Sequence, residues 1–347
     1  LLSAALWINL ATWVGAPVST THSIVGGVMG AGIAAAGFSA VNWMTMSKIA
    51  ASWVISPVLG GVIAALFLWL IKSRIIYQPD KIAAARRWVP ILIAIMSGAF
   101  ASYLALKGIK KIIKIDIQTA IIIGFLIGVA TWAITKPIIA KQSVGMENRN
   151  KSLKQLFNIP LIVSAALLSF AHGANDVANA VGPLAAIVQA SSSGEYITAI
   201  SIPLWVMVIG AAGISFGLFL FGPKLVRVVG SQITKLNQMR AYCVALSAAI
   251  TVIVASWLGL PVSSTHIAVG SVFGVGFFRE WDSARRMKLA KLSSDKNQLV
   301  VAKEERARRK LVRRSHFMSI IAAWIITVPS AAVISGIIYS VILFSTG

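Results

Sequence analysis

The sequence has few charged residues, and acidic residues and cysteine are especially scarce. Only 12% of its 347 residues are charged, whereas soluble domains average about 25%. The single cysteine, Cys243, lies in an apolar run. It therefore excludes an intrachain disulfide and a cysteine-based metal site, and we expect it to be a small core residue. The low charge content argues against a soluble protein.

The sequence contains several long apolar runs. Hydrophobic residues make up 57% of the chain, and about 20 consecutive apolar residues are enough for a helix to cross a bilayer. The sequence therefore predicts an all-α, polytopic helical membrane protein, and short loops favour a bacterial inner membrane. The predicted membrane segments are 1–15, 49–71, 89–106, 118–135, 156–190, 202–222, 241–278 and 317–344.

Three of these segments have unusual features. Segments 156–190 and 241–278 are too long for one simple span and contain glycine, proline and polar residues, which predicts broken or re-entrant helices. Segment 1–15 starts the chain without a methionine and within an apolar run. We expect from this start that the chain is an N-terminally truncated fragment.

Basic residues outnumber acidic ones, 32 to 10, and give a formal net charge of +22. Such a charge could indicate a nucleic-acid partner, but the lysines and arginines lie in or beside predicted loops. The densest group, 279–316, contains thirteen of them. Basic loops of membrane proteins are usually cytoplasmic, so we expect a solvated cytoplasmic loop near the lipid headgroups and no nucleic acid.

The sequence contains an internal repeat. "ATWVGAPVSTTHSIVGGVMGAG" (11–32) aligns without gaps with "ASWLGLPVSSTHIAVGSVFGVG" (255–276), and thirteen of the 22 positions are identical. The similarity extends to "ASWVISP" (51–57) and "AAWIITVP" (322–329), with one insertion. The chain therefore contains two copies of one structural unit.

The loops after the two copies indicate opposite orientations. "FSAVNWMTMSKIA" follows the first copy and has one basic residue, whereas the loop after the second copy has thirteen. The positive-inside rule places the first loop outside and the second inside, which predicts an inverted-topology repeat. We expect 1–72 to be the remainder of the first repeat, 73–155 to be linking spans and loops, and 156–347 to be the second repeat. One loop, 107–116, conflicts with this topology because it has four lysines on the predicted outer side.

Asp176 is the one acidic residue deep in an apolar segment, within "SFAHGANDVANAVGPLAAI". Burying a carboxylate there costs about 2.5–3.5 kcal/mol, so it normally faces a cavity or a partner. Asn175 and Asn179 lie close to one helix face, and Gly173 and Gly182-Pro183 would allow the helix to break. Broken helices build ion sites in many transporters.

The "PVSTTH" and "PVSSTH" motifs predict helix N-termini. Proline suits the first helical turn, and serine and threonine cap free backbone N–H groups. A helix N-terminus attracts anions, so two such elements related by inversion would surround a small oxyanion near the bilayer midplane. The hydroxyl residues are Ser19, Thr20 and Thr21 in the first copy and Ser263, Ser264 and Thr265 in the second.

Three histidines lie in these motifs: His22, His172 and His266. They lack metal-ligand spacing and a cysteine partner, so we expect no transition metal and interpret them as residues that position the motifs. A proton-handling role stays open.

The combination of "GANDVANA" with "PVSTTH" and "PVSSTH" resembles the inorganic phosphate transporter (PiT) family over essentially the whole chain. The resemblance implies secondary active transport of inorganic phosphate with a coupling cation, Na⁺ or H⁺, by alternating access. It places Asn175, Asp176 and Asn179 at signature positions for phosphate and cation, and the six hydroxyl residues at positions for phosphate and cation. Family members have GANDVAN in each half, whereas this sequence has one copy, and Ala180 replaces a frequent serine.

We assign Asn175 and the six hydroxyl residues to phosphate, and Asp176 with Asn179 to the cation. The resemblance implies no cofactor beyond the ion, and leaves open a metal–phosphate complex as cargo and a homodimer. Sulfate or another oxyanion is the main alternative substrate. A membrane hydrolase would need Ser263, His266 and Asp176 as a triad, but a duplicated Ser/Thr-His element is unexpected for one catalytic centre. A scaffold without transport would not require Asp176.

Overall fold

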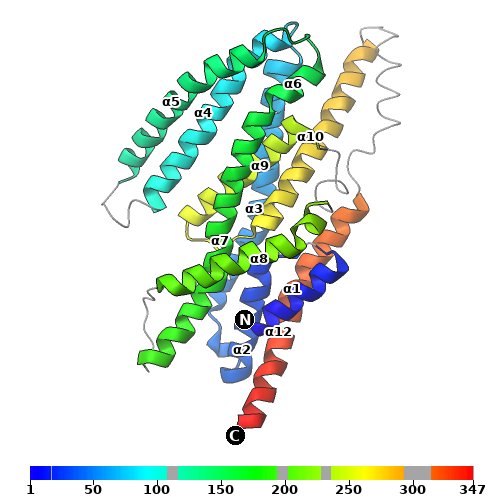
Figure 1. The fold of residues 1–347 in the computed structure, drawn as a ribbon. Helices are drawn as coiled ribbons and strands as arrows, with labels where there is room; N and C mark the ends of the chain where they lie inside the picture. The colour runs from blue at the N-terminus through cyan, green and yellow to red at the C-terminus, as the bar shows by residue number, and fades with distance from the viewer. Residues whose placement is uncertain (17, 108–115, 194–201, 228–235, 293–313, 347) are drawn as a thin grey trace.

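The computed structural model describes residues 1–16, 18–107, 116–193, 202–227, 236–292 and 314–346, and these residues form helices and no strand (Figure 1). The predicted all-α class is therefore confirmed. The loop at 107–116 lies almost wholly outside the described residues. The elements are α1 (Leu2–Val14), α2 (Thr20–Ala36), η1 (Phe38–Ala40), α3 (Trp43–Ile71), η2 (Lys72–Ile76), α4 (Lys81–Lys107), α5 (Ile117–Gln142), α6 (Asn150–Leu156), α7 (Asn158–Ser193), α8 (Leu204–Arg227), α9 (Gln238–Trp257), α10 (Ser264–Leu292) and α12 (Arg314–Thr346).

Seven helices of the described chain are long and apolar enough to cross a membrane, namely α3 with η2, α4, α5, α7, α8, α9 and α12. The predicted span 1–15 is too short to count, because α1 has only 13 residues. The long segment 241–278 is divided between α9 and α10. These helices indicate a multi-pass integral membrane protein.

The core lies where α3, α4, α7, α9 and α10 meet. Its large buried side chains include Leu68, Met96, Phe157 and Tyr242. The Tyr242 hydroxyl donates to the carbonyl of Leu92 at 3.2 Å, so its polar end is satisfied, as buried hydroxyls require. Helices α8 and α12, by contrast, expose apolar side chains along much of their length, as expected of lipid-facing helices.

The two repeat copies form the same local structure. A glycine in the left-handed region follows each of α1 and α9: Gly15 caps α1 with φ 82°, and Gly259 comes one residue after the Leu258 cap of α9 with φ 71°. Glycine adopts this conformation without steric cost, and it turns the chain toward the next helix. In each copy a serine then caps that helix: the side chain of Ser19 accepts from the backbone N–H of His22, and Ser263 accepts from that of His266, both at 3.2 Å.

The copies pack against each other through small residues. α2 lies against α12, and α3 lies against α10. Backbones approach closely because glycine lines both contacts: Gly30 of α2 faces the backbone of Ala332, and Gly274 of α10 faces that of Gly61. Small residues permit such approach in membrane helices. In Figure 1, α3 and α10 run toward the upper end, whereas α12 runs toward the C-terminus at the lower end. α3 and α12, which contain the matching segments 51–57 and 322–329, therefore run in opposite directions, in agreement with the predicted inversion. The inverted repeat and the domain boundaries stay predictions.

Several local expectations were wrong. α7 is one continuous helix through Gly173 and Pro183, because membrane helices tolerate both residues where neighbours satisfy the freed backbone groups. Pro261 lies two residues before the Ser263 cap rather than in the first turn, and Pro17 lies outside the described residues. The predicted loop 279–316 begins as helix, because α10 continues to Leu292.

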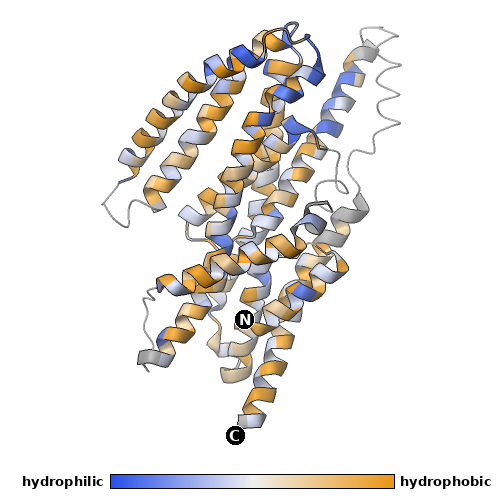
Figure 2. Cartoon of the chain, in the orientation of Figure 1, coloured by the Kyte–Doolittle hydropathy of each residue, from blue (hydrophilic) through white to orange (hydrophobic). Residues whose placement is uncertain are grey.

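Hydropathy follows the arrangement of the helices. Hydrophilic residues gather at the upper end of the bundle in Figure 2, where α4 begins, α5 ends and α10 ends. The helices below this end are mainly apolar. The upper end therefore corresponds to the basic side of the predicted topology, which the positive-inside rule makes cytoplasmic.

Candidate functional site

The candidate site centres on Asp176 in the middle of α7. Its side chain is buried, with the residue 6% exposed, and three donors reach its two oxygens. Thr20 Oγ1 donates to Oδ2 at 2.9 Å, and Ser264 Oγ donates to Oδ1 at 3.0 Å. The amide of Asn175 also donates to Oδ1, at 2.9 Å. The prediction that Asp176 has partners rather than lipid around it is confirmed.

Two helix N-termini meet at this carboxylate. Thr20 is the first residue of α2, and Ser264 is the first residue of α10. Each helix N-terminus carries about half a positive charge, so two such ends stabilise an anionic group between them. The "PVSTTH" motif at α2, "GANDVANA" in α7 and "PVSSTH" at α10 therefore lie next to one another at Asp176.

Amide and hydroxyl side chains extend the cluster toward the loop before α10. The carbonyl of Val262 accepts from Asn175 Nδ2 at 2.9 Å and from Thr21 Oγ1 at 3.0 Å. Asn179 Nδ2 in turn donates to Thr21 Oγ1 at 2.9 Å. This network connects α7 to both repeat copies through neutral oxygens, which are suitable ligands for hard cations.

His172 lies at the edge of the cluster, one helical turn before Asp176. Its Nδ1 is 2.5 Å from Ser264 Oγ, and its Nε2 is 3.6 Å from Asp176 Oδ2. The imidazole therefore contacts both a hydroxyl and the carboxylate, and its side chain is 41% exposed. The structure brings His172 to the site, while its assigned role of positioning the motif stays a prediction.

The other two motif histidines, His22 and His266, form a separate contact with each other. The rings of His22 and His266 meet edge to face with centroids 4.3 Å apart. Each packs on a tryptophan of its own copy: His22 on Trp53 at 3.8 Å, and His266 on Trp324 at 3.7 Å. Both histidines are buried. They hold the two copies together rather than facing Asp176.

Sequence reasoning did not assign a role to the two tryptophans or to Val262. Trp53 donates through Nε1 to the carbonyl of Pro261 at 3.1 Å, and so fixes the turn that precedes α10. The signal was present in the repeat, because Trp53 and Trp324 stand at matching places in "ASWVISP" and "AAWIITVP". The Val262 carbonyl could not be found from side-chain chemistry.

Five of the six hydroxyl residues have one of two structural roles. Ser19 and Ser263 are buried, and their oxygens cap α2 and α10. Thr20, Thr21 and Ser264 belong to the network around Asp176. Thr265 is partly buried beside them on α10. The assignment of all six to phosphate stays a prediction.

The geometry does not form a hydrolase triad. Ser263 Oγ contacts the backbone of His266, while the His266 ring stacks on Trp324. Asp176 binds the neighbouring hydroxyl of Ser264. A nucleophile, a base and an orienting carboxylate need mutual hydrogen bonds, and these three residues do not make them.

Comparison with known proteins gives consistent results over nearly the whole chain. The chain is 46% identical to a candidate phosphate permease of Helicobacter pylori (strain J99) over 98% of this chain and 73% of that protein. It is 33% identical to a candidate phosphate permease of Pyrococcus furiosus, over 100% of this chain and 77% of that protein. A solved structure titled as the sodium-dependent phosphate transporter matches with a TM-score of 0.85 and 33% identity, over 99% of this chain and 78% of that one.

These relatives are named as permeases or transporters and not as enzymes, which agrees with the absence of a triad among Ser263, His266 and Asp176. The model of the phosphate transporter family matches residues 1–335. On this match, which covers nearly all of the sequence, the chain belongs to the phosphate transporter family.

Proposed function

We propose that the protein is a secondary active transporter that moves inorganic phosphate together with a cation. One observation carries the proposal: equivalent hydroxyls from two helix N-termini converge on the buried carboxylate of Asp176. Buried ionisable groups inside membrane proteins mark substrate and ion pathways. Family membership and the names of the relatives supply phosphate as the substrate.

The phosphate would bind at the N-termini of α2 and α10, beside Asn175. Backbone N–H groups there bind oxyanions, and Thr265 would add a hydroxyl donor. Thr20, Thr21 and Ser264 would have to turn their single O–H groups from Asp176 and Val262 to the anion. We assign Ser19 and Ser263 to the same site through the helix ends that they cap. Phosphate at neutral pH retains a proton that a carboxylate can accept, whereas sulfate has none. This difference favours phosphate over sulfate, which is the second candidate.

The coupling cation would bind at Asp176 and Asn179. An anion alone is costly to move through a low-dielectric centre, and a cation next to it lowers the net charge. The carboxylate, the Thr21 hydroxyl and the Asn179 amide oxygen would supply the oxygen ligands that suit Na⁺. The solved relative is titled sodium-dependent, so we propose Na⁺ first and a proton on Asp176 as the alternative.

Alternating access would use the contacts between the repeat copies. α2 packs on α12 and α3 packs on α10, so each packed pair combines one helix from each copy. We propose that the copies form an inverted repeat and that these pairs rock around the site, as in other inverted-repeat transporters. The site then opens to one side at a time while Asp176 stays between the helix ends.

Uptake of radiolabelled phosphate into proteoliposomes tests the proposal with the full-length protein. We expect an inward Na⁺ gradient to drive uptake and Asp176→Asn to reduce it to the level of empty vesicles. Asp116→Asn is the matched control, because Asp116 caps α5 from an exposed position and asparagine is an equally good cap. A proton gradient that replaced Na⁺ would identify the other ion.

Three results would contradict the proposal. Sulfate uptake without phosphate uptake would assign the site to the other oxyanion. Full phosphate uptake by Asp176→Asn would show that the buried carboxylate is structural, and no flux of either anion would favour a scaffold.

A further inference from the structure

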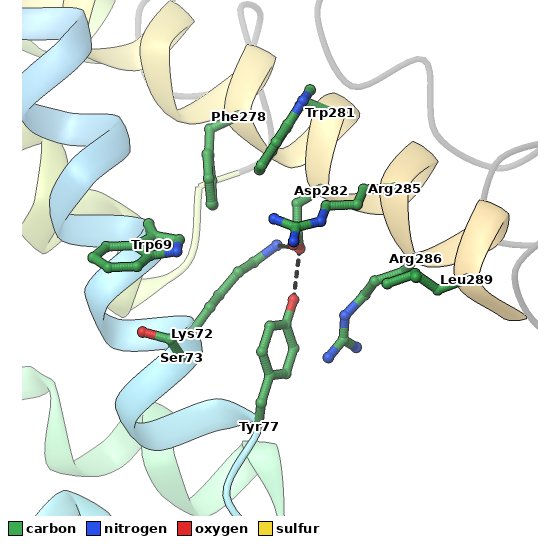
Figure 3. A pocket seen from close by; sticks show the side chains of 10 residues that line it. All are labelled: Trp69, Lys72, Ser73, Tyr77, Phe278, Trp281, Asp282, Arg285, Arg286 and Leu289. Carbon is green, nitrogen blue, oxygen red and sulfur yellow. Dashed lines mark hydrogen bonds and ion pairs between the residues drawn. The ribbon is translucent and has the colours of Figure 1, made fainter.

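A second polar site lies at the upper end of the bundle, away from Asp176. A pocket of about 220 Å³ opens between the end of α3, the η2 turn and the C-terminal half of α10 (Figure 3). Lys72, Tyr77, Arg285 and Arg286 line it together with Asp282. None of these residues belongs to the network around Asp176.

The pocket is built by a local change of helix type. Residues Lys72–Ile76 form a π-helix, in which the backbone N–H of Tyr77 donates to the carbonyl of Lys72 at 2.9 Å. In an α-helix a residue five positions further along points about 140° away from the first. The i→i+5 bond of the π-helix instead keeps the side chains of Lys72 and Tyr77 on the same side. Lys72 and Tyr77 therefore both reach Asp282. Such π-turns occur frequently at functional sites.

One carboxylate organises the pocket. Lys72 Nζ and the Tyr77 hydroxyl both lie 2.5 Å from Asp282 Oδ2. Burial raises the pKa of Asp282, but hydrogen bonds from Lys72 and Tyr77 and the charge of Arg286 outweigh that effect and hold the pKa below its usual value. Asp282 is therefore ionised at neutral pH, and it neutralises one of the three cations that line the pocket.

The two arginines supply the remaining charge. The guanidinium of Arg286 lies 3.3 Å from the centroid of the Tyr77 ring, and that of Arg285 lies 5.4 Å from the centroid of the Trp281 ring. Aromatic faces restrain guanidinium groups by cation–π attraction, which leaves their N–H groups available. In Figure 3 the side chains of Arg285 and Arg286 extend from α10 toward Asp282 and Tyr77. Arginine forks match the oxygens of a phosphate group.

The pocket lies at the depth of the lipid headgroups. Trp69 and Trp281 line it and are 51% and 53% exposed, and exposed tryptophans mark the membrane–water interface. The apolar span of α3 ends at Ile76, and α10 becomes strongly basic beyond Arg279. This end is the hydrophilic one in Figure 2, on the side that the positive-inside rule makes cytoplasmic.

We propose that this pocket binds a phosphate group, held by Arg285 and Arg286 and bordered by Tyr77 and Trp281. Two sources share this chemistry: the headgroup of an anionic phospholipid and inorganic phosphate from the cytoplasm. The inference does not depend on transport at Asp176, because the two sites have no residue in common.

Two binding measurements test the site with the full-length protein. Native mass spectrometry would count bound phosphatidylglycerol against phosphatidylcholine. Equilibrium binding of radiolabelled inorganic phosphate would be measured in phosphatidylcholine nanodiscs, in the Asp176→Asn background so that the proposed transport site contributes little. Both are repeated with Arg285→Gln and Arg286→Gln, singly and together, and we expect about a fivefold loss of binding for each cation removed.

Lys288→Gln is the matched control, because Lys288 is exposed on the same helix and does not line the pocket. If the arginine variants, but not Lys288→Gln, lose binding of phosphatidylglycerol, the result supports the lipid source. If they instead lose binding of inorganic phosphate and keep that of the lipid, the result supports the free anion. Equal binding of both probes by the arginine variants and Lys288→Gln, with unchanged melting temperatures, would overturn the proposal. Failure of phosphate uptake by the unmodified protein would leave the lipid measurement unaffected.

Discussion

Thr20 and Ser264 occupy equivalent positions in the two repeat copies, and their hydroxyls donate to opposite oxygens of the same Asp176 carboxylate, at 2.9 and 3.0 Å. The two copies of the motif therefore bind one carboxylate, Asp176, which has no second copy in this sequence. α7 brings one carboxylate to two helix N-termini. A binding site made in this way changes whenever the two copies move relative to each other.

The first prediction concerns these two hydroxyls. Thr20→Val and Ser264→Ala each leave a carboxylate oxygen short of a donor, which costs about 1–3 kcal/mol. Because the carboxylate is the proposed cation ligand, we expect the Na⁺ concentration for half-maximal phosphate uptake to shift by about tenfold. Thr20→Ser and Ser264→Thr are the controls, since each introduces the residue of the other copy. An unchanged Na⁺ dependence in Thr20→Val would separate the hydroxyl from cation binding.

The second prediction distinguishes a helix cap from a phosphate ligand at Ser263. Its oxygen accepts from the backbone N–H of His266, and loss of such a cap to alanine costs about 1 kcal/mol, while glycine costs only a few tenths. We expect Ser263→Ala to lower the thermal unfolding midpoint and Ser263→Gly to lower it less. If instead both variants melt like the unmodified protein and both lose uptake, the hydroxyl acts on the substrate directly.

The third prediction uses the repeat as its own control. Trp53 and Trp324 each pack on a motif histidine. The Trp53 indole also donates to the carbonyl of Pro261, whereas the Trp324 indole meets no acceptor among the residues that the structure describes. Trp53→Phe should therefore destabilise the protein by about 1 kcal/mol more than Trp324→Phe, the net value of a hydrogen bond. Thermal unfolding in detergent measures the difference. Equal losses would mean that ring packing alone matters at both positions.

The sequence predicted that the two motif copies and Asp176 come together, because duplication carries more information than composition. The alignment of 11–32 with 255–276 identified Thr20 and Ser264 as equivalent, and the isolated Asp176 identified the third partner. Each of these inferences needs only residue identity and spacing. Hydrophobic runs likewise located most of the membrane helices, but not their ends: α3 begins at Trp43 rather than 49, α4 at Lys81 rather than 89, and α5 ends at Gln142 rather than 135.

Features set by tertiary contacts were not predictable in the same way. Gly173 and Pro183 suggested a break in α7, but intrinsic helix preference is overridden in a bundle that satisfies the backbone, and the helix continues. Positive charge suggested that a loop starts at Arg279, whereas packing against α3 prolongs α10 to Leu292. The π-turn at Lys72 directs that side chain to Asp282, a partner 210 residues away in sequence.

The last prediction concerns the contact between α3 and α10, which holds one copy against the other. A Cβ added at Gly274 would collide with the backbone of Gly61, whereas one added at Gly213 on α8 would meet nothing within 4 Å. Backbone cannot move aside as a side chain can, so Gly274→Ala forces the helices apart. Overpacking of this kind costs about 1–3 kcal/mol, while alanine in an open helical position gains up to about 1 kcal/mol over glycine. We therefore expect Gly274→Ala to lower the melting temperature and Gly213→Ala to leave it unchanged or raise it. Equal melting of the two variants would show that the α3–α10 contact is looser than this structure describes.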